Sequence, residues 1–155
     1  MTLETLAQYG VERMDDEAVR AFLTTQNVGI LGLPTADAPV LLPLSFGFDG
    51  ESTLYFTFVL QGDSEKQARA EQAEAATFLV YQADTAFTWQ SARLTGRIEP
   101  VPEDEVDAAR DALANAWRPT LFEESTDGVD VELYRFVVAD WSAIKQTGLP
   151  PGFDG

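Results

Sequence analysis

The sequence contains no cysteine and no histidine. Without cysteine, the chain can form no disulfide, no thiolate-held iron–sulfur cluster and no thiol nucleophile. Without histidine, it lacks the commonest metal ligand and the commonest general base. We therefore predict no metal site and assign no catalytic residue.

Lysine and long apolar runs are also scarce. The only lysines are Lys66 and Lys145, and ten cations face 26 carboxylates, which gives a net charge of −16. Such a chain repels nucleic acid and anionic membranes. Abundant acids with almost no lysine favour a salt-adapted, haloarchaeal type of source, where ions screen self-repulsion, over an ordinary acidic protein. No run reaches the roughly 18 apolar residues of a membrane span, and the N-terminus lacks a secretory pattern, so we expect a cytoplasmic protein.

The pattern of apolar residues predicts a single, mainly β domain over residues 1–155. The predicted strands are 27–33, 39–48, 53–60, 77–83, 86–101 and 131–141. Short turns join several consecutive strands, which indicates antiparallel pairing. Six strands in about 155 residues can close as a small barrel with helices outside it. A doubly wound parallel fold would need helical crossovers between most strands, and these are missing.

Three helices are predicted, at 14–25, 64–75 and 103–117. Asp15 can cap the first helix, and Met14 has the spacing to Val19 of a hydrophobic staple. Gly96 interrupts the long fifth strand and predicts a bend or bulge there. The tail from Lys145 onward is predicted to be a loop.

The segment "GDSEKQA" (62–68) reads as a helix start that could bind an anion. Ser64 and Gln67 have the spacing of a capping box. The dipole disfavours a cation in a first helical turn by roughly 0.3–1 kcal/mol, and a bound phosphate would account for Lys66 there. The alternative is that Ser64 and Gln67 cap a helix at which nothing binds. The residues alone leave both open.

Tryptophans and strand glycines offer further candidates. Trp89, Trp117 and Trp141 could stack on a ligand ring or simply fill core and interface positions. Gly32 and Gly47 lie within predicted strands, where a flat ligand or another backbone could approach closely or the barrel could bend.

The segments "PVLLPLSFGFDGESTLYFTF", "GDSEKQARA" and "WQSARLTGRIEPV" occur in an order and spacing that resemble a known family. They are similar to the FMN-binding split β-barrel proteins of the pyridoxamine 5′-phosphate oxidase-like superfamily over residues 15 to about 103. The resemblance implies a six-stranded antiparallel split β-barrel with peripheral helices. It also implies a homodimer that holds FMN at the subunit interface.

The resemblance also implies cofactor contacts at the phosphate end. Lys66 matches the lysine that contacts the FMN phosphate, and Ser64 matches the serine before it. Glu65 stands where the oxidases have an arginine. Arg69, one turn beyond Lys66, is the candidate to substitute for the lost cation.

Further matched positions concern the flavin ring. Phe56 and Thr57 match a residue pair that lies against the cofactor. The backbone of the strand segment Leu42, Pro43, Leu44 and Ser45 is expected to meet the isoalloxazine ring. Ser91 falls where the oxidases place a flavin-contacting glutamine. Leu41 replaces a strand arginine of those enzymes.

The resemblance implies a flavin-dependent oxidoreductase that acts on an unidentified small molecule. The C-terminal segment with which true oxidases recognise the vitamin substrate has no match here, so we do not predict that reaction. The alternative is a dimer that binds flavin or a small anion without turnover.

Overall fold

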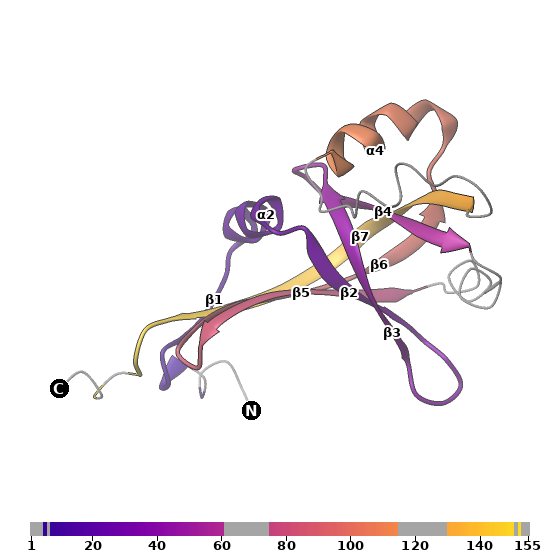
Figure 1. Cartoon of the computed structure of the whole chain (residues 1–155). Helices are drawn as coiled ribbons and strands as arrows, with labels where there is room; N and C mark the ends of the chain where they lie inside the picture. The colour runs from indigo at the N-terminus through magenta and orange to yellow at the C-terminus, as the bar shows by residue number, and fades with distance from the viewer. Residues whose placement is uncertain (1–4, 6, 61–74, 115–129, 151, 153–155) are drawn as a thin grey trace.

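The computed structural model describes residues 5, 7–60, 75–114, 130–150 and 152, and strands dominate this part of the chain. The strands are β1 (Val11–Arg13), β2 (Val28–Leu33), β3 (Val40–Phe48), β4 (Thr53–Leu60), β5 (Ala76–Thr85), β6 (Thr88–Pro100) and β7 (Asp130–Thr147). The helical elements are α2 (Asp16–Thr25), the short 3-10 helix η1 (Glu103–Glu105) and α4 (Val106–Leu113). This described part is mainly β, as predicted, and helices α2 and α4 lie outside the sheet (Figure 1).

The six long strands close into one antiparallel barrel. Their order is β7–β4–β3–β2–β5–β6, and β6 pairs with β7 to complete the circle. Closure depends on the length of β7: residues 134–147 pair with β6 along one edge, while 130–137 pair with β4 and 144–146 with β1 along the other. The predicted six-stranded antiparallel barrel is confirmed.

Alternate residues of the strands face the barrel interior. Leu31 on β2 lies opposite Phe78 on β5, which lies opposite Leu94 on β6, and all three are fully buried. The rings of Phe46 and Phe78 meet edge-on with centroids 5.4 Å apart. Burying each such side chain contributes about 1.5–3 kcal/mol of stability. The interior core therefore fixes which face of each strand points inward.

Helix α2 packs onto this core through the residues that the sequence predicts. Asp15 caps it by accepting a hydrogen bond from the backbone N–H of Ala18 at 2.8 Å. Met14 and Val19 are both buried in the core cluster, as expected of a staple. The cap and the staple together explain why the helix begins at Asp16.

Helix α4 packs against the outside of β3 and β4. Leu113 and Ala109 form a small buried cluster with Tyr55 of β4. The helix comes so close to β3 that a Cβ on Gly47 would lie 2.2 Å from the carbonyl oxygen of Ala112. Gly47 is therefore required by the close approach of another backbone, that of α4, which is one of the readings expected from the sequence.

Several boundaries differ from the predicted ones. The short strand β1 was not predicted, and β7 continues to Thr147 where a loop was expected, because β6 and β1 offer it partners. The β6–β7 register shifts between Thr95 and Gly96, which confirms the predicted bulge. The predicted helix 64–75 lies outside the described residues, apart from its last position. The predicted helix 103–117 begins as a 3-10 turn, and its end also falls outside them.

Candidate functional site

One half of β3 is paired on one side only. Residues Val40–Ser45 pair with β2, whereas β4 pairs with β3 only at Phe46, Gly47 and Phe48. Among the described strands, none continues the ladder on the other side of Val40–Ser45. We call this edge the open side of β3.

The hydrogen-bond ladder defines which backbone groups face the open side. Asp49 donates to Thr53 across the β3–β4 hairpin at 3.0 Å, and the backbone N–H of Phe46 donates to Asn27 on the β2 side at 3.0 Å. Ladder groups alternate along a strand, so the N–H and C=O of Ser45 and the C=O of Pro43 point to the open side. Proline lacks an N–H and is tolerated in a strand at such an edge. Pro43 therefore costs the β2–β3 ladder no hydrogen bond.

The side chains of this segment divide between the two faces of the sheet. Leu42 and Leu44 pack partly buried against the interior core. Pro43 and Ser45 are on the opposite face, with Pro43 exposed and Ser45 half-buried. On the outside of the barrel, the segment Leu42–Ser45 therefore presents its backbone and the small side chains of Pro43 and Ser45, none of which is charged.

Ser91 lies on this same outside face. Ser91 pairs with Tyr81 on β5 and with Ile144 on β7, and Ser45 pairs with Val28 on β2. In the next cross-strand row, Pro43, Ile30, Leu79 and Arg93 follow one another across four strands. We call these two rows the outer face; its members are Val28, Ile30, Pro43, Ser45, Leu79, Tyr81, Ser91, Arg93 and Ile144.

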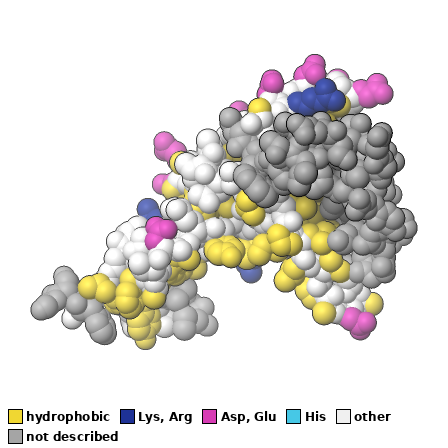
Figure 2. Space-filling view, in the orientation of Figure 1, with side chains coloured by type: hydrophobic (Ala, Val, Ile, Leu, Met, Phe, Trp, Pro, Cys, Tyr) yellow, Lys and Arg dark blue, Asp and Glu magenta, His cyan; other side chains and the backbone are white. Residues whose placement is uncertain are grey.

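The outer face is largely apolar and accessible. Val28 and Tyr81 are 46% and 55% exposed, and the neighbouring Leu41 is 64% exposed. Figure 2 shows hydrophobic side chains gathered along the hollowed lower surface, below strands β2 and β5. Arg93 makes no ion pair with any residue that the structure describes. An apolar surface of this extent is typical of an interaction or ligand face.

The remaining predicted ring contacts lie on β4. Phe56 is fully buried and stacks on Tyr134 with centroids 6.1 Å apart, so its side chain belongs to the interior. Thr57, the next residue, is half-buried on the opposite side of the strand. Phe56 could contact a ligand outside the barrel only through its backbone. Ser64, Lys66 and Arg69 lie outside the described residues, as does Trp117.

The two described tryptophans have structural partners. The indole N–H of Trp89 donates to the side-chain oxygen of Gln146 at 3.1 Å. That of Trp141 donates to Asp16 at 2.9 Å, and the Arg20 guanidinium lies 5.2 Å from the Trp141 ring centroid. These contacts tie β6 and α2 to β7.

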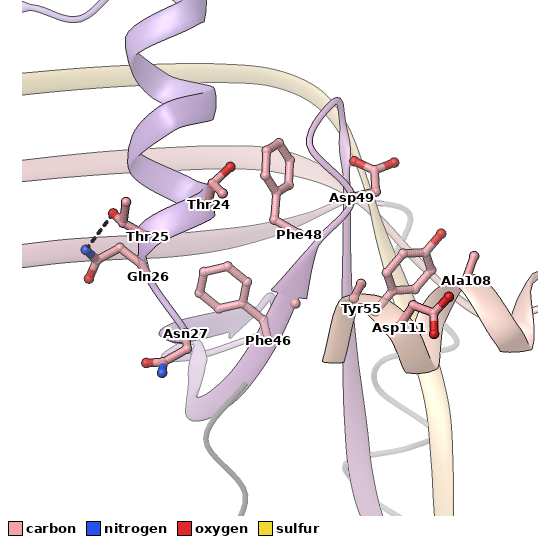
Figure 3. Close-up of a pocket in the computed structure, with 12 residues that line it drawn as sticks. Thr24, Thr25, Gln26, Asn27, Phe46, Phe48, Asp49, Tyr55, Ala108 and Asp111 are labelled. Carbon is pink, nitrogen blue, oxygen red and sulfur yellow. Dashed lines mark hydrogen bonds between the residues drawn. The ribbon is translucent and has the colours of Figure 1, made fainter. Parts of the chain in front are cut away.

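A cavity that the sequence did not indicate lies at the other end of β3. It has a volume of about 480 Å³ and is bordered by the end of α2, the end of β3 and α4 (Figure 3). Its lining residues are Thr24, Thr25, Gln26, Asn27, Phe46, Gly47, Phe48, Asp49, Tyr55, Ala108, Asp111 and Ala112. No pattern within one segment could have revealed it, because four separate segments contribute.

An ion-pair cluster adjoins Tyr55 beneath η1. Arg135 donates to Glu99 at 2.6 Å and also pairs closely with Glu105. The hydrogen bond from Arg135, opposed in part by burial, holds the pKa of Glu99 below its usual 4.5. Burial raises the pKa of Tyr55, and the charges of Glu105 and Asp49 add to that effect. Tyr55 is therefore a neutral hydrogen-bond donor at ordinary pH.

In the part of the chain that the structure describes, no group of three or more carboxylates is placed so that it could hold a metal ion. None of the described helices is long and apolar enough to cross a membrane.

Comparisons with known proteins agree with this architecture. A structure of an FAD-binding protein from Mesorhizobium loti is 20% identical, with a TM-score of 0.68, and the match covers 89% of this chain and 98% of that one. An FAD-binding protein from Mycobacterium smegmatis is 14% identical, with a TM-score of 0.68 and coverage of 88% and 100%. An FAD- and heme-binding protein from the same organism is 22% identical, with a TM-score of 0.66 and coverage of 94% and 77%.

Sequence comparison assigns the family. No curated protein matches the sequence. The sequence model of the family described as pyridoxamine 5′-phosphate oxidase matches residues 15–145, which is most of the chain. The protein belongs to the pyridoxamine 5′-phosphate oxidase family.

Proposed function

We propose that the protein is a cytoplasmic flavoprotein, a homodimer that holds FMN between its subunits and acts as an oxidoreductase on a small molecule. The open side of β3 is the observation that supports this most directly. It presents the backbone groups of Pro43 and Ser45 next to an apolar face. A flavin ring carries both hydrogen-bond acceptors and a donor on one edge and is apolar on its faces, so the two surfaces match its chemistry.

The residues divide into a ring site and a phosphate site. At the ring site, Pro43 and Ser45 would offer backbone groups, and Ser91 a hydroxyl, from the outer face. At the phosphate site we place Ser64, Lys66 and Arg69, which follow β4 in the chain, with Thr57 between the two sites. Leu41, exposed beside the outer face, would add apolar contact with the second subunit.

When bound, the flavin would supply hydride or electron transfer, and the protein would supply its position and its surroundings. Apolar residues of the outer face, such as Ile30 and Leu79, would exclude water from the ring. The chain has no histidine to act as a general base. Protons would therefore exchange with solvent at the site's edge.

The cofactor is tested by purification. The purified protein should absorb at about 375 and 450 nm, as flavins do, and mass analysis of the released cofactor should give FMN. Similar structures are described as FAD-binding proteins, so release of FAD would keep the flavin proposal and correct the cofactor. Colourless protein that takes up neither FMN nor FAD in molar salt would overturn it.

The phosphate site is tested at Lys66. Lys66→Ala should weaken FMN binding by about 1.5–3 kcal/mol, the contribution of a hydrogen bond to a charged group. Lys145→Ala removes the other lysine, on β7, and should leave the affinity unchanged. Equal affinity for both variants and the parent protein would place the phosphate elsewhere.

The alternative function is binding without turnover. Glu65 and Leu41, in place of two cations of the oxidases, favour it because fewer charges would hold the phosphate. Anaerobic addition of NADH or NADPH separates the two functions. Bleaching of the flavin would support an oxidoreductase, whereas a flavin that stays oxidised with both donors would support a carrier.

A further inference from the structure

The outer face continues across β7 to β1 and becomes polar and basic there. Arg93 on β6 pairs with Ser142 on β7. Two residues further along β7, Ile144 pairs with Ser91 on one side and with Arg13 of β1 on the other. Paired residues of antiparallel strands share a face of the sheet, and so do residues two apart along one strand. Two arginines and two serines therefore lie around Ile144 on one surface, and we call Arg13, Ser91, Arg93 and Ser142 the arginine patch.

The spacing of the patch lets both guanidinium groups approach one ligand. Arg13 and Arg93 are two strands apart, which is about 10 Å across the sheet at the usual strand spacing. Both residues are exposed, and the methylene groups of an arginine carry its guanidinium over neighbouring side chains. The hydroxyls of Ser91 and Ser142 belong to the same two rows. A group that sits above Ile144 would therefore meet donors from several directions.

The described part of the chain does not neutralise these arginines. Arg13 and Arg93 make no ion pair and no side-chain hydrogen bond with any residue that the structure describes. Arg97 and Arg135, by contrast, both contact Glu99. The chain has 26 carboxylates for ten cations, so carboxylate partners are plentiful. Two arginines without one on a largely apolar face point to an anion from outside the chain.

Neighbouring carboxylates leave the patch accessible to an anion. Glu12 pairs with Lys145 and so lies on the opposite face of the sheet. Asp140 pairs with Thr95, one row beyond Arg93, and makes no ion pair with it. Salt at about 1 M limits the reach of the other charges to about 3 Å, so contacts within the patch decide what binds.

We propose that the arginine patch binds the carboxylate or phosphate group of a small molecule whose apolar part lies on the outer face. The fork of an arginine matches two oxygens of such a group, and Leu79 and Tyr81 offer apolar contact beside it. The role of the site rests on the proposed function, in which it would hold the acidic group of the substrate. The row from Pro43 to Arg93 spans three strand spacings, about 14 Å, so the flavin ring and the acidic group can occupy opposite ends of one face.

The test is an NMR titration of the purified full chain, with whatever flavin it carries, using benzoate. Backbone amides of Ser91, Arg93 and Ser142 should shift together and saturate. The neutral analogue benzamide has nearly the same shape and should bind at least about fivefold more weakly. Equal binding of the two compounds, no saturation, or shifts that map elsewhere would overturn the proposal.

Three substitutions give the titration its controls. Arg93→Gln and Arg13→Gln should each weaken benzoate binding about five- to tenfold, the loss expected for a hydrogen bond to a charged group at an exposed site. Arg110→Gln removes an exposed arginine of α4, outside the patch, and should change the affinity less than about twofold. If Arg110→Gln weakens binding as much as Arg93→Gln, the anion merely follows the net charge of the chain and the proposal fails.

Flavin titrations separate a substrate group from the phosphate of the cofactor. Arg93→Gln should bind FMN and riboflavin, which lacks the phosphate, as the parent protein does, because we place that phosphate at Lys66. A loss of affinity for FMN but not for riboflavin would give the patch to the cofactor and overturn the proposal. Colourless protein that binds benzoate at the patch would overturn the flavin proposal and keep this site. Flavin-loaded protein that does not bind benzoate there would overturn this site alone.

Discussion

At the scale of single residues, Gly47 shows how closely the helical layer approaches the barrel. Its missing side chain lets the carbonyl oxygen of Ala112 come to 2.2 Å from where a Cβ would be, a contact that real Cβ atoms do not make. The neighbour is helix backbone, which cannot rotate away. Gly32, on β2, meets only ordinary contacts at 3.6 Å.

We expect Gly47→Ala to lower the free energy of unfolding by about 1–3 kcal/mol, because α4 must shift off β3. Gly32→Ala should change it by less than about 0.5 kcal/mol. Urea denaturation of both variants measures this. A Gly47→Ala protein as stable as Gly32→Ala would show that α4 does not pack as described.

At the scale of elements, Arg135 connects three of them. From β7 it donates to Glu99 on β6 and pairs with Glu105 at the end of η1. Arg97 also contacts Glu99 at 3.3 Å. Both partners of Arg135 follow the β6 bulge in the chain, so the cluster holds the segment leading into α4 against the barrel.

Removal of one carboxylate should change how the free energy of unfolding depends on pH, because the ion-pair cluster stabilises the fold only while its carboxylates are charged. Glu99→Gln should lower the free energy of unfolding near pH 7 by about 1 kcal/mol, since Glu105 still pairs with Arg135. The Glu99 pKa is lowered in the folded state, so its contribution is present above the usual value of 4.5 and is lost as pH falls through the folded value. The difference between the two proteins should therefore shrink in acid.

Chemical denaturation of both proteins from neutral pH down to about pH 3 measures this difference. Glu103→Gln removes an exposed carboxylate of η1, near Glu99 in the chain, and serves as the control; it should stay close to the parent protein throughout. A Glu99→Gln difference that grows in acid would contradict the assignment.

At the scale of the whole molecule, the apolar outer face and the net charge act together. A chain with 26 carboxylates and ten cations repels copies of itself. The outer face concentrates apolar residues on four strands and carries one cation, Arg93. Two copies that associate through this face would bring together surfaces without carboxylates, so the contact itself would add no repulsion between carboxylates.

The dimer prediction is tested with two exposed tyrosines. Tyr81 lies on the outer face and Tyr9 does not, and both are 55% exposed. Tyr81→Glu should weaken self-association at least about tenfold by placing a charge in the interface, whereas Tyr9→Glu should not. Sedimentation velocity over a concentration series measures both. Equal association of the two variants would place the interface elsewhere.

The net charge predicts dependence on salt. The melting temperature should rise between about 0.1 M and 2 M KCl, because screening shortens the range of self-repulsion from about 10 Å to a few ångströms. Calorimetry measures the change, with a neutral osmolyte at matched osmolality as control. A melting temperature independent of KCl would argue against adaptation to high salt.

The sequence determined those features that depend on neighbours along the chain. Apolar runs separated by turn residues predicted the six long strands, and Asp15 with Met14 and Val19 predicted the start of α2. The bulge at Gly96 was also foreseen, because glycine marks such positions. The order of weak motifs was enough for the family, which the match over residues 15–145 confirms.

Only the tertiary structure decided features that depend on register between distant segments. The open side of β3 exists because β4 pairs with it from Phe46 onward, and no local pattern encodes where a pairing stops. The length of β7 depends on the partners at its two edges. The buried cluster of Tyr55, Ala109 and Leu113 and the tight contact at Gly47 arise where α4 meets the barrel. Local propensity therefore specified the elements, and long-range packing specified the surfaces to which a ligand can bind.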